Sequence, residues 1–211
     1  MPRTASPTAL AVFSGDDVHE DLFTAAREVR TLLTDEGFVT RTAVGTGRFD
    51  GPVDAELIVL YTALGRFTDA QRASLARAVR GGAGLIALHS TTVDADLFDL
   101  VGSRYVSHGP PPHESRFTVT LDGAHEVTAG IPPFELTHEH YHVETAPGVL
   151  TLARRTTPGG TEPLLHVREF GDGRVCYLQL GHDMRSWGEP AVRLLVRRAA
   201  RWACRLEARG N

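Results

Sequence analysis

Short apolar runs alternate with segments of helical periodicity up to residue 90 of the chain. The predicted strands cover residues 8–14, 38–44, 56–61 and 84–88, of which 8–14, 56–61 and 84–88 are apolar runs. Near-continuous apolar strands are typical of a parallel sheet that is buried on both faces. Between the runs, apolar residues recur at helical spacing over 18–33, and a second helix-like segment spans 70–82. This alternation predicts right-handed βαβ units and a doubly wound sheet.

Beyond residue 90 the pattern changes to a succession of strands. The predicted elements are a short helix at 96–101, a loop at 102–112, strands at 116–121, 134–145, 149–154, 164–170 and 175–180, and a last helix at 189–206. Gly171-Asp172-Gly173 between two of these strands is a hairpin turn signal. We therefore expect one α/β domain over residues 1–211, with a mostly parallel sheet and antiparallel additions.

Two helix starts carry capping signals. Asp17 with Glu20 three residues later predicts a capping box for the first helix. Thr68 with Gln71 predicts the same arrangement for the second helix, and Gly81 marks its end.

Composition and charge exclude several classes of function. The net charge is −4, and all 22 basic residues are arginine, which excludes Schiff-base lysine chemistry and a P-loop lysine. The arginines of the last helix are expected to form a solvated face, so we expect no nucleic-acid partner. Gly45-Thr46-Gly47 lacks a third correctly spaced glycine, and no nucleotide cofactor is expected. No apolar run reaches 18 residues, so we expect a cytoplasmic protein with no membrane partner.

The two cysteines and Ser90 do not resemble nucleophiles. Cys176 is expected within a strand and Cys204 within a helix, where both would be packing residues in a reducing compartment. Ser90 follows an apolar strand, but the surrounding Gly-x-Ser-x-Gly elbow of a serine hydrolase is missing. A cysteine-dependent or serine-dependent hydrolysis is therefore not expected.

Histidines gather where the predicted strands end. His89 and His182 each follow an apolar strand, and His19 and His108 lie on loops. Open α/β sheets bind ligands at the carboxyl ends of their strands, and a histidine pKa near 6.5 suits acid–base work. The residues that we expect to contact substrate at this edge are Gly15, Asp16, His19, Ser90 and Asp183.

A metal site is the alternative chemistry for this edge. On one continuous strand over 134–145, His138, His140 and His142 would share a face, with Glu139 and Tyr141 on the opposite face. Histidines two residues apart on a strand can chelate a divalent metal such as zinc. If that face meets solvent instead, the triplet is only a polar edge.

Taken together, these residues resemble the ThuA family, named for trehalose utilisation. The matching pieces are Phe13-Ser14-Gly15 with His19, Gly84 to Ser90, Gly102 with His108, His125 to Ile131, Glu139 with Tyr141, Gly173-Arg174-Val175, and Leu180 to Asp183. Their order and spacing span nearly the whole chain. One position departs from the family pattern, because His138 stands where relatives tend to carry an acidic residue.

The resemblance implies a flavodoxin-like fold similar to class I glutamine amidotransferases, and a role in the metabolism of sugars or oxidised sugars. The expected catalytic residues are His89, His108, Glu139, Tyr141 and His182. Glu139 would orient a histidine or take a proton, and Tyr141 would donate a hydrogen bond to the sugar. We expect these residues and His19 to converge in one cleft with a small carbohydrate as partner. A non-catalytic sugar- or partner-binding domain stays open as the alternative, as does assembly into a homo-oligomer.

Overall fold

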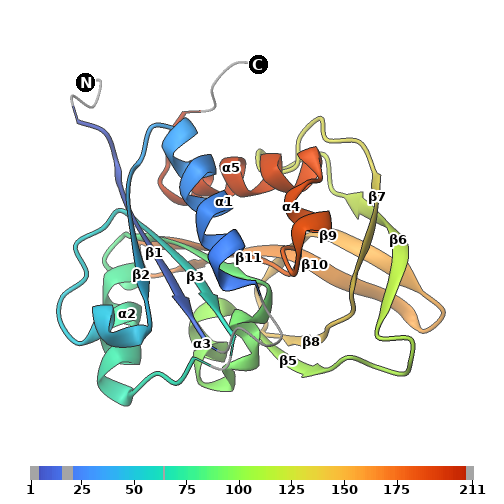
Figure 1. The fold of residues 1–211 in the computed structure, drawn as a ribbon, viewed down its shortest axis with the longest axis horizontal. Helices are drawn as coiled ribbons and strands as arrows, with labels where there is room; N and C mark the ends of the chain where they lie inside the picture. Colours follow the sequence, from blue (N-terminus) through green and yellow to red (C-terminus); the bar gives the residue numbers. More distant parts are fainter. Residues whose placement is uncertain (1–4, 16–20, 64, 208–211) are drawn as a thin grey trace.

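A nine-stranded sheet runs through the computed structural model, which describes residues 5–15, 21–63 and 65–207 (Figure 1). The strand order is β2-β1-β3-β4-β11-β10-β9-β6-β7. The first five strands in that order run parallel; they are β2 (Val39–Val44), β1 (Thr8–Ser14), β3 (Leu57–Thr62), β4 (Gly84–Leu88) and β11 (Gly173–Leu178). Every residue of β3 and β4 is buried, as their apolar composition predicts.

The other four strands extend the sheet with antiparallel pairs. They are β10 (Gly160–Phe170), β9 (Leu150–Thr157), β6 (Glu114–Leu121) and β7 (Phe134–Glu139). The β10–β11 pair turns at Gly171 and Asp172, so the predicted hairpin is confirmed. The expected fold class, a mostly parallel α/β sheet with antiparallel additions, is confirmed as well.

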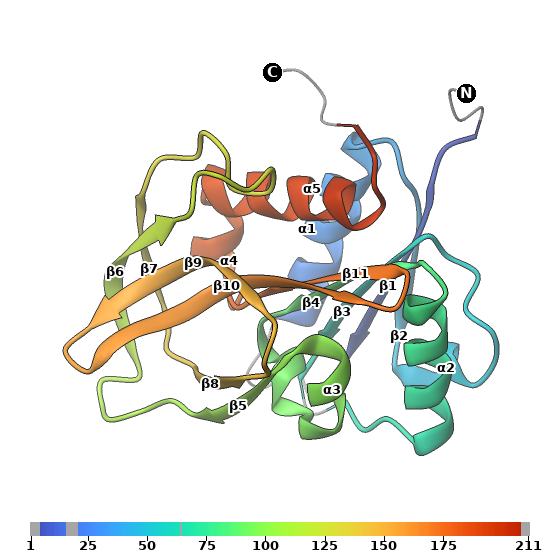
Figure 2. The ribbon, with the colours of Figure 1, turned by 180° about the vertical axis from the view of Figure 1, so that it is seen from behind.

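Helices cover both faces of the parallel half (Figures 1 and 2). On one face lie α1 (Leu22–Asp35), the short α4 (Met184–Trp187) and α5 (Pro190–Ala203). On the other lie α2 (Asp69–Arg80) and α3 (Phe98–Val101). Two buried apolar clusters, one on each face, hold these layers to the sheet. Short 3-10 segments at Thr46–Phe49, His89–Val93 and Ala95–Leu97 complete the connections.

Helix boundaries differ in part from the predicted ones. The first helix begins at Leu22, and its cap is Asp21, whose carboxylate accepts from the backbone N–H of Thr24 at 2.9 Å. The predicted cap at Asp17 is therefore wrong for this helix, and Asp17 itself lies outside the described residues. The capping box of Thr68 and Gln71 is confirmed.

A small second sheet corrects two predictions. The expected loop at 102–112 contains β5 (Ser103–Ser107), which pairs with β8 (His142–Thr145) and lies beside α3 (Figure 2). The expected single strand over 134–145 is broken at His140 and Tyr141, where the chain leaves β7 and enters this second sheet. β7 pairs with β6, whereas β8 pairs with β5. The local pattern of apolar residues does not show which strand each of them will pair with.

None of the helices in the described ranges is both long enough and apolar enough to cross a membrane.

Candidate active site

His89 lies where β4 passes into the 3-10 segment His89–Val93. Its φ of 39° falls in the left-handed region, which costs a non-glycine residue about 1–3 kcal/mol. The ring is fully buried, and its Nδ1 lies 2.7 Å from the carbonyl oxygen of Gln179. The Tyr177 hydroxyl donates to the His89 carbonyl at 3.1 Å. Groups from β11 and its end therefore hold both the turn and the direction of the ring.

Three side-chain atoms meet at this point and form what we call the His–Glu–His cluster, made of His89, Glu139 and His182. Nε2 of His89 lies 3.2 Å from Oε2 of Glu139 and 3.2 Å from Nδ1 of His182. Nδ1 of His182 lies 3.5 Å from Oε2 of Glu139. These residues come from the ends of β4 and β7 and from the loop between β11 and α4. Segments that are far apart in the sequence thus bring these three side chains together in one site.

Hydrogen bonding defines the protonation of the cluster. Because a carbonyl oxygen only accepts, His89 donates its Nδ1–H to Gln179, and Nε2 is the ring atom that faces Glu139 and His182. Burial alone would raise the pKa of Glu139, but the hydrogen bond from His89 and the charges of the neighbouring histidines outweigh it and lower that pKa. Glu139 is therefore ionised at neutral pH. The three facing atoms need at least one proton or cation between them.

Two tyrosine rings pack against His89. The Tyr141 ring stacks on it with centroids 4.5 Å apart and planes at 21°, and the Tyr61 ring lies at 6.2 Å and 24°. The Tyr61 hydroxyl donates to the carbonyl of Gly181 at 3.1 Å, while the Gln179 amide donates to the carbonyl of Tyr141 at 3.0 Å. These contacts fix the aromatic wall and the loop that carries the neighbouring histidine.

A further histidine reaches the cluster directly after β5. Nδ1 of His108 lies 3.0 Å from the carbonyl oxygen of His140 and 3.5 Å from Oε1 of Glu139. Its side chain is about one-third exposed, at 34%. His108 therefore meets the carboxylate through the oxygen that does not face His89. The structure thus brings together five of the six residues expected in one cleft, and the sixth, His19, lies outside the described residues.

His138 holds backbone rather than a metal. Its Nδ1 donates to the Glu139 carbonyl at 2.7 Å, and its Nε2 accepts from the backbone N–H groups of Gly181 at 3.2 Å and His182 at 3.3 Å. Burial and the neighbouring charge of His89 lower the pKa of His138 to about 3, so the ring is neutral. The acidic residue of the family pattern would offer an acceptor of the same kind here.

The other two members of the expected metal triplet point elsewhere. Nε2 of His140 lies 2.7 Å from the Ser115 hydroxyl, and Nδ1 of His142 lies 2.7 Å from Glu162. The expectation that His138, His140 and His142 share one face is therefore wrong, because the strand breaks between them. Within the described ranges, the group of three possible metal ligands with all ligand atoms within 4.8 Å is instead the His–Glu–His cluster.

The expected substrate-contacting residues have mixed placements. Gly15, with φ 132°, approaches the Ala63 backbone so closely that a Cβ would lie 1.7 Å from its carbonyl oxygen. Ser90 is buried, at 1% exposure, behind the strand end. Asp183 caps α4, and Arg185 donates to it at 2.8 Å. Asp16 lies outside the described residues. Gly15 therefore lies against the Ala63 backbone, the Ser90 side chain is buried, and Asp183 lies one residue from the cluster.

Sequence reasoning missed Gln179 and the ion pair around Arg185. Gln179 is a lone polar residue within an apolar run, and that interruption was a usable signal. Arg185 bridges Asp183 to Glu114, donating to the latter at 2.8 Å. Arg185 and Glu114 are 71 positions apart, so the local sequence around either residue does not indicate that they pair.

Neither cysteine lies in the cluster. Cys176 is buried within β11, and burial raises the pKa of its thiol to about 12. Cys204 follows α5, and its thiol contacts the carbonyl of Glu56 at 3.4 Å. The turn directly after β4 carries His89 and no cysteine.

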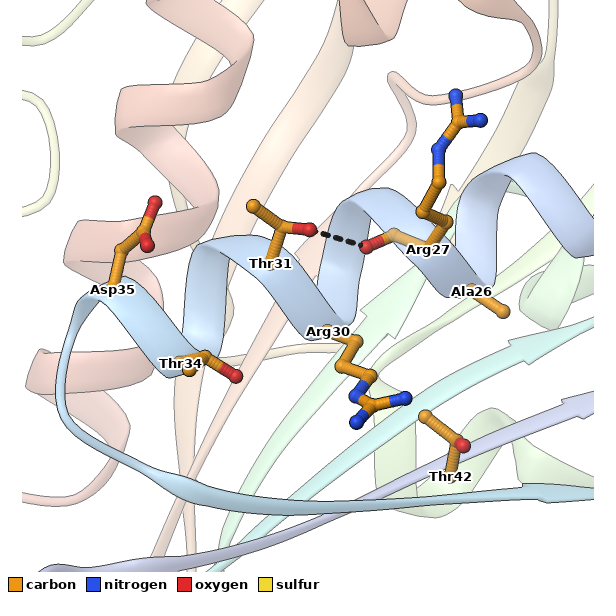
Figure 3. A pocket seen from close by; sticks show the side chains of 7 residues that line it. All are labelled: Ala26, Arg27, Arg30, Thr31, Thr34, Asp35 and Thr42. Carbon is orange, nitrogen blue, oxygen red and sulfur yellow. Dashed lines mark hydrogen bonds between the residues drawn. The ribbon is translucent and has the colours of Figure 1, made fainter.

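A groove between α1 and β2 lies apart from this chemistry (Figure 3). It has a volume of about 490 Å³ and is lined by Ala26, Arg27, Arg30, Thr31, Thr34, Asp35 and Thr42. The Thr31 hydroxyl donates to the Arg27 carbonyl at 2.9 Å, within its own helix. Among the residues that the structure describes, no histidine lines this groove, so they offer no acid–base pair comparable to the cluster.

Comparison with known proteins identifies the family of this chain. The family model for ThuA, described as trehalose utilisation, matches residues 9–203. The chain belongs to the ThuA family. Membership gives it a carbohydrate-related role. A sequence comparison with curated proteins finds no match.

Solved structures show the same fold. A ThuA-like protein from Bacteroides uniformis ATCC 8492 is 18% identical with a TM-score of 0.76, covering 96% of this chain and 95% of that one. A ThuA-like protein from Parabacteroides merdae ATCC 43184 is 15% identical with a TM-score of 0.74, covering 95% and 90%. A β-galactosidase from Bacillus circulans sp. alkalophilus is 12% identical with a TM-score of 0.65, covering 92% of this chain and 30% of that one.

Proposed function

We propose that this ThuA-family chain is an enzyme that acts on a sugar or an oxidised sugar by proton transfer. The observation that carries the proposal is the convergence of His89, Glu139 and His182 within 3.5 Å of one another at the carboxyl edge of the sheet. Buried neighbours orient each of these groups, which is what a catalytic constellation needs. The partner would be a small carbohydrate in the cytoplasm.

The charge of the cluster supports a division of roles. Glu139 has a lowered pKa and is ionised, so it is the group able to accept a proton. The side chains of Glu139 and His182 are each 21% exposed, whereas that of His89 is fully buried. Substrate would therefore contact Glu139 and His182 directly. His89 would orient the Glu139 carboxylate and share a proton with it.

An oxidised sugar fits these groups chemically. The carbonyl of such a sugar acidifies the neighbouring C–H bond, and a positioned carboxylate can remove that proton. A histidine can return it to another carbon or pass it to a leaving oxygen, which gives an isomerase or a lyase. His108 at the exposed rim contacts the second carboxylate oxygen and is placed to relay the proton.

The test is a screen that separates turnover from binding. Protein purified without a histidine tag is incubated with oxidised and unoxidised disaccharides, and NMR follows both product formation and ligand binding. The proposal expects product from at least one oxidised sugar. Saturable binding without product across the panel would support the non-catalytic sugar-binding alternative instead.

A further inference from the structure

We propose that the His–Glu–His cluster binds one divalent transition-metal ion of the zinc type. The ligands are Nε2 of His89, Oε2 of Glu139 and Nδ1 of His182. The role of this ion in catalysis rests on the proposed function, whereas its binding does not require turnover.

The spacing of the three atoms matches a tetrahedral site. With metal–ligand bonds of about 2.0–2.1 Å, two ligand atoms of a tetrahedron lie about 3.3 Å apart. The observed separations are 3.2, 3.2 and 3.5 Å. A triangle with these edges has a circumradius of about 1.9 Å, so an ion about 0.7 Å out of its plane reaches all three atoms at bonding distance.

The surroundings of the ligands also suit a metal. A metal-bound histidine usually donates its other N–H to a carbonyl or carboxylate, which fixes the tautomer. His89 does this through Nδ1 to Gln179 at 2.7 Å, so Nε2 is left as the ligand atom. The second oxygen of Glu139 meets His108 at 3.5 Å, which orients the carboxylate.

The ligand set selects the class of ion. Two imidazoles and one carboxylate suit zinc and neighbouring transition metals, whereas magnesium and calcium prefer oxygen ligands. Three protein ligands leave a fourth position for water or a substrate oxygen, as in catalytic zinc sites. Glu139 and His182 are each partly exposed, so that position opens toward solvent. An ion there would polarise a sugar carbonyl or hydroxyl.

The alternative to a metal ion is a proton that the three atoms of the His–Glu–His cluster share. Charge-assisted N–H···O contacts are usually about 2.7–2.9 Å long. The two N···O separations of the cluster, 3.2 and 3.5 Å, are longer, whereas the contacts that His89 and His138 make to carbonyls are 2.7 Å. The cluster is therefore more open than the hydrogen bonds around it, which favours a cation over a proton.

The experiment measures metal binding directly. Untagged protein is stripped with a chelator and titrated by calorimetry with Zn²⁺ and, separately, with Mg²⁺. A parallel titration with Co²⁺ follows the visible absorption that reports tetrahedral coordination. The inference expects one equivalent of Zn²⁺, no Mg²⁺ binding at the same concentrations, and the tetrahedral Co²⁺ spectrum.

Matched variants assign the site. His182→Asn and Glu139→Gln should each weaken Zn²⁺ binding by on the order of 10²-fold, and His113→Asn, on the exposed rim, should leave it unchanged. Circular dichroism identifies the variants that keep the fold, and the Co²⁺ spectrum is read only for those. Stoichiometric Zn²⁺ binding without sugar turnover would uphold this inference while overturning the proposed enzyme. Turnover by stripped protein that binds no Zn²⁺ would overturn this inference alone.

Discussion

The acceptor role of His138 gives a sharp test of how the site is held. In the described structure, its Nε2 is the shared acceptor for the backbone N–H groups of Gly181 and His182. His138→Leu fills the position with an apolar side chain but leaves both backbone donors, one buried and one partly buried, without that acceptor. An unsatisfied buried donor costs about 1–3 kcal/mol. Because the two bonds are long, at 3.2 and 3.3 Å, we expect a total loss of roughly 3 kcal/mol.

The assay is urea unfolding at neutral pH, followed by circular dichroism. His138→Gln retains an acceptor oxygen and should lose less than half as much of the free energy of unfolding. The control is His125→Leu, because His125 accepts one part-buried N–H, that of Val127, at 3.2 Å. That change should cost no more than about 1 kcal/mol. If His138→Leu proves as stable as His138→Gln, the two backbone bonds do not hold this loop and the reasoning is refuted.

Three further predictions follow from single positions. Cys176→Ser should leave any turnover within a few-fold of wild type, because the buried thiol lies outside the cluster; loss of turnover in a folded variant would restore a thiol mechanism. Burial lowers the pKa of His166 to about 4, so below pH 6.5 the unfolded chain binds a proton that the folded chain does not. Stability should therefore fall by up to about 3 kcal/mol between pH 6.5 and 4, and acid titrations of His166→Asn should show a shallower slope. Gly15→Ala places a Cβ against the Ala63 carbonyl at positive φ and should cost roughly 2–5 kcal/mol in urea unfolding, whereas an unchanged midpoint would contradict the close approach.

Most of the parallel half of the fold could be predicted because β1, β3, β4 and β11 are apolar runs that the local sequence shows. β4 is a continuous apolar run that ends at His89, and β11 is a similar run that leads to His182. The carboxyl ends of parallel strands share one edge, so topology alone brings these two histidines to the same rim. The hairpin between β10 and β11 could be predicted because its turn signal, Gly171-Asp172-Gly173, lies within three consecutive residues.

The β7–β8 region could not be predicted in the same way. Residues 134–145 alternate well enough for one strand, yet Glu139 ends β7 and His142 begins β8 in a different sheet. The break depends on pairing with β5 and β6, which is a long-range choice that periodicity does not encode. It also removes the expected metal triplet and moves the candidate ligand set to Glu139 and the strand-end histidines.

We propose that Glu139 moves a proton on a sugar derivative within the His–Glu–His cluster. The most direct measurement compares kcat/KM for Glu139→Gln and Glu135→Gln on the best substrate of the screen. Both residues lie on β7, but Glu135 is exposed and pairs with Arg116 at the surface. We predict a loss on the order of 10²-fold or more for Glu139→Gln and no more than a few-fold change for Glu135→Gln. Equal rates in the two folded variants would contradict the account.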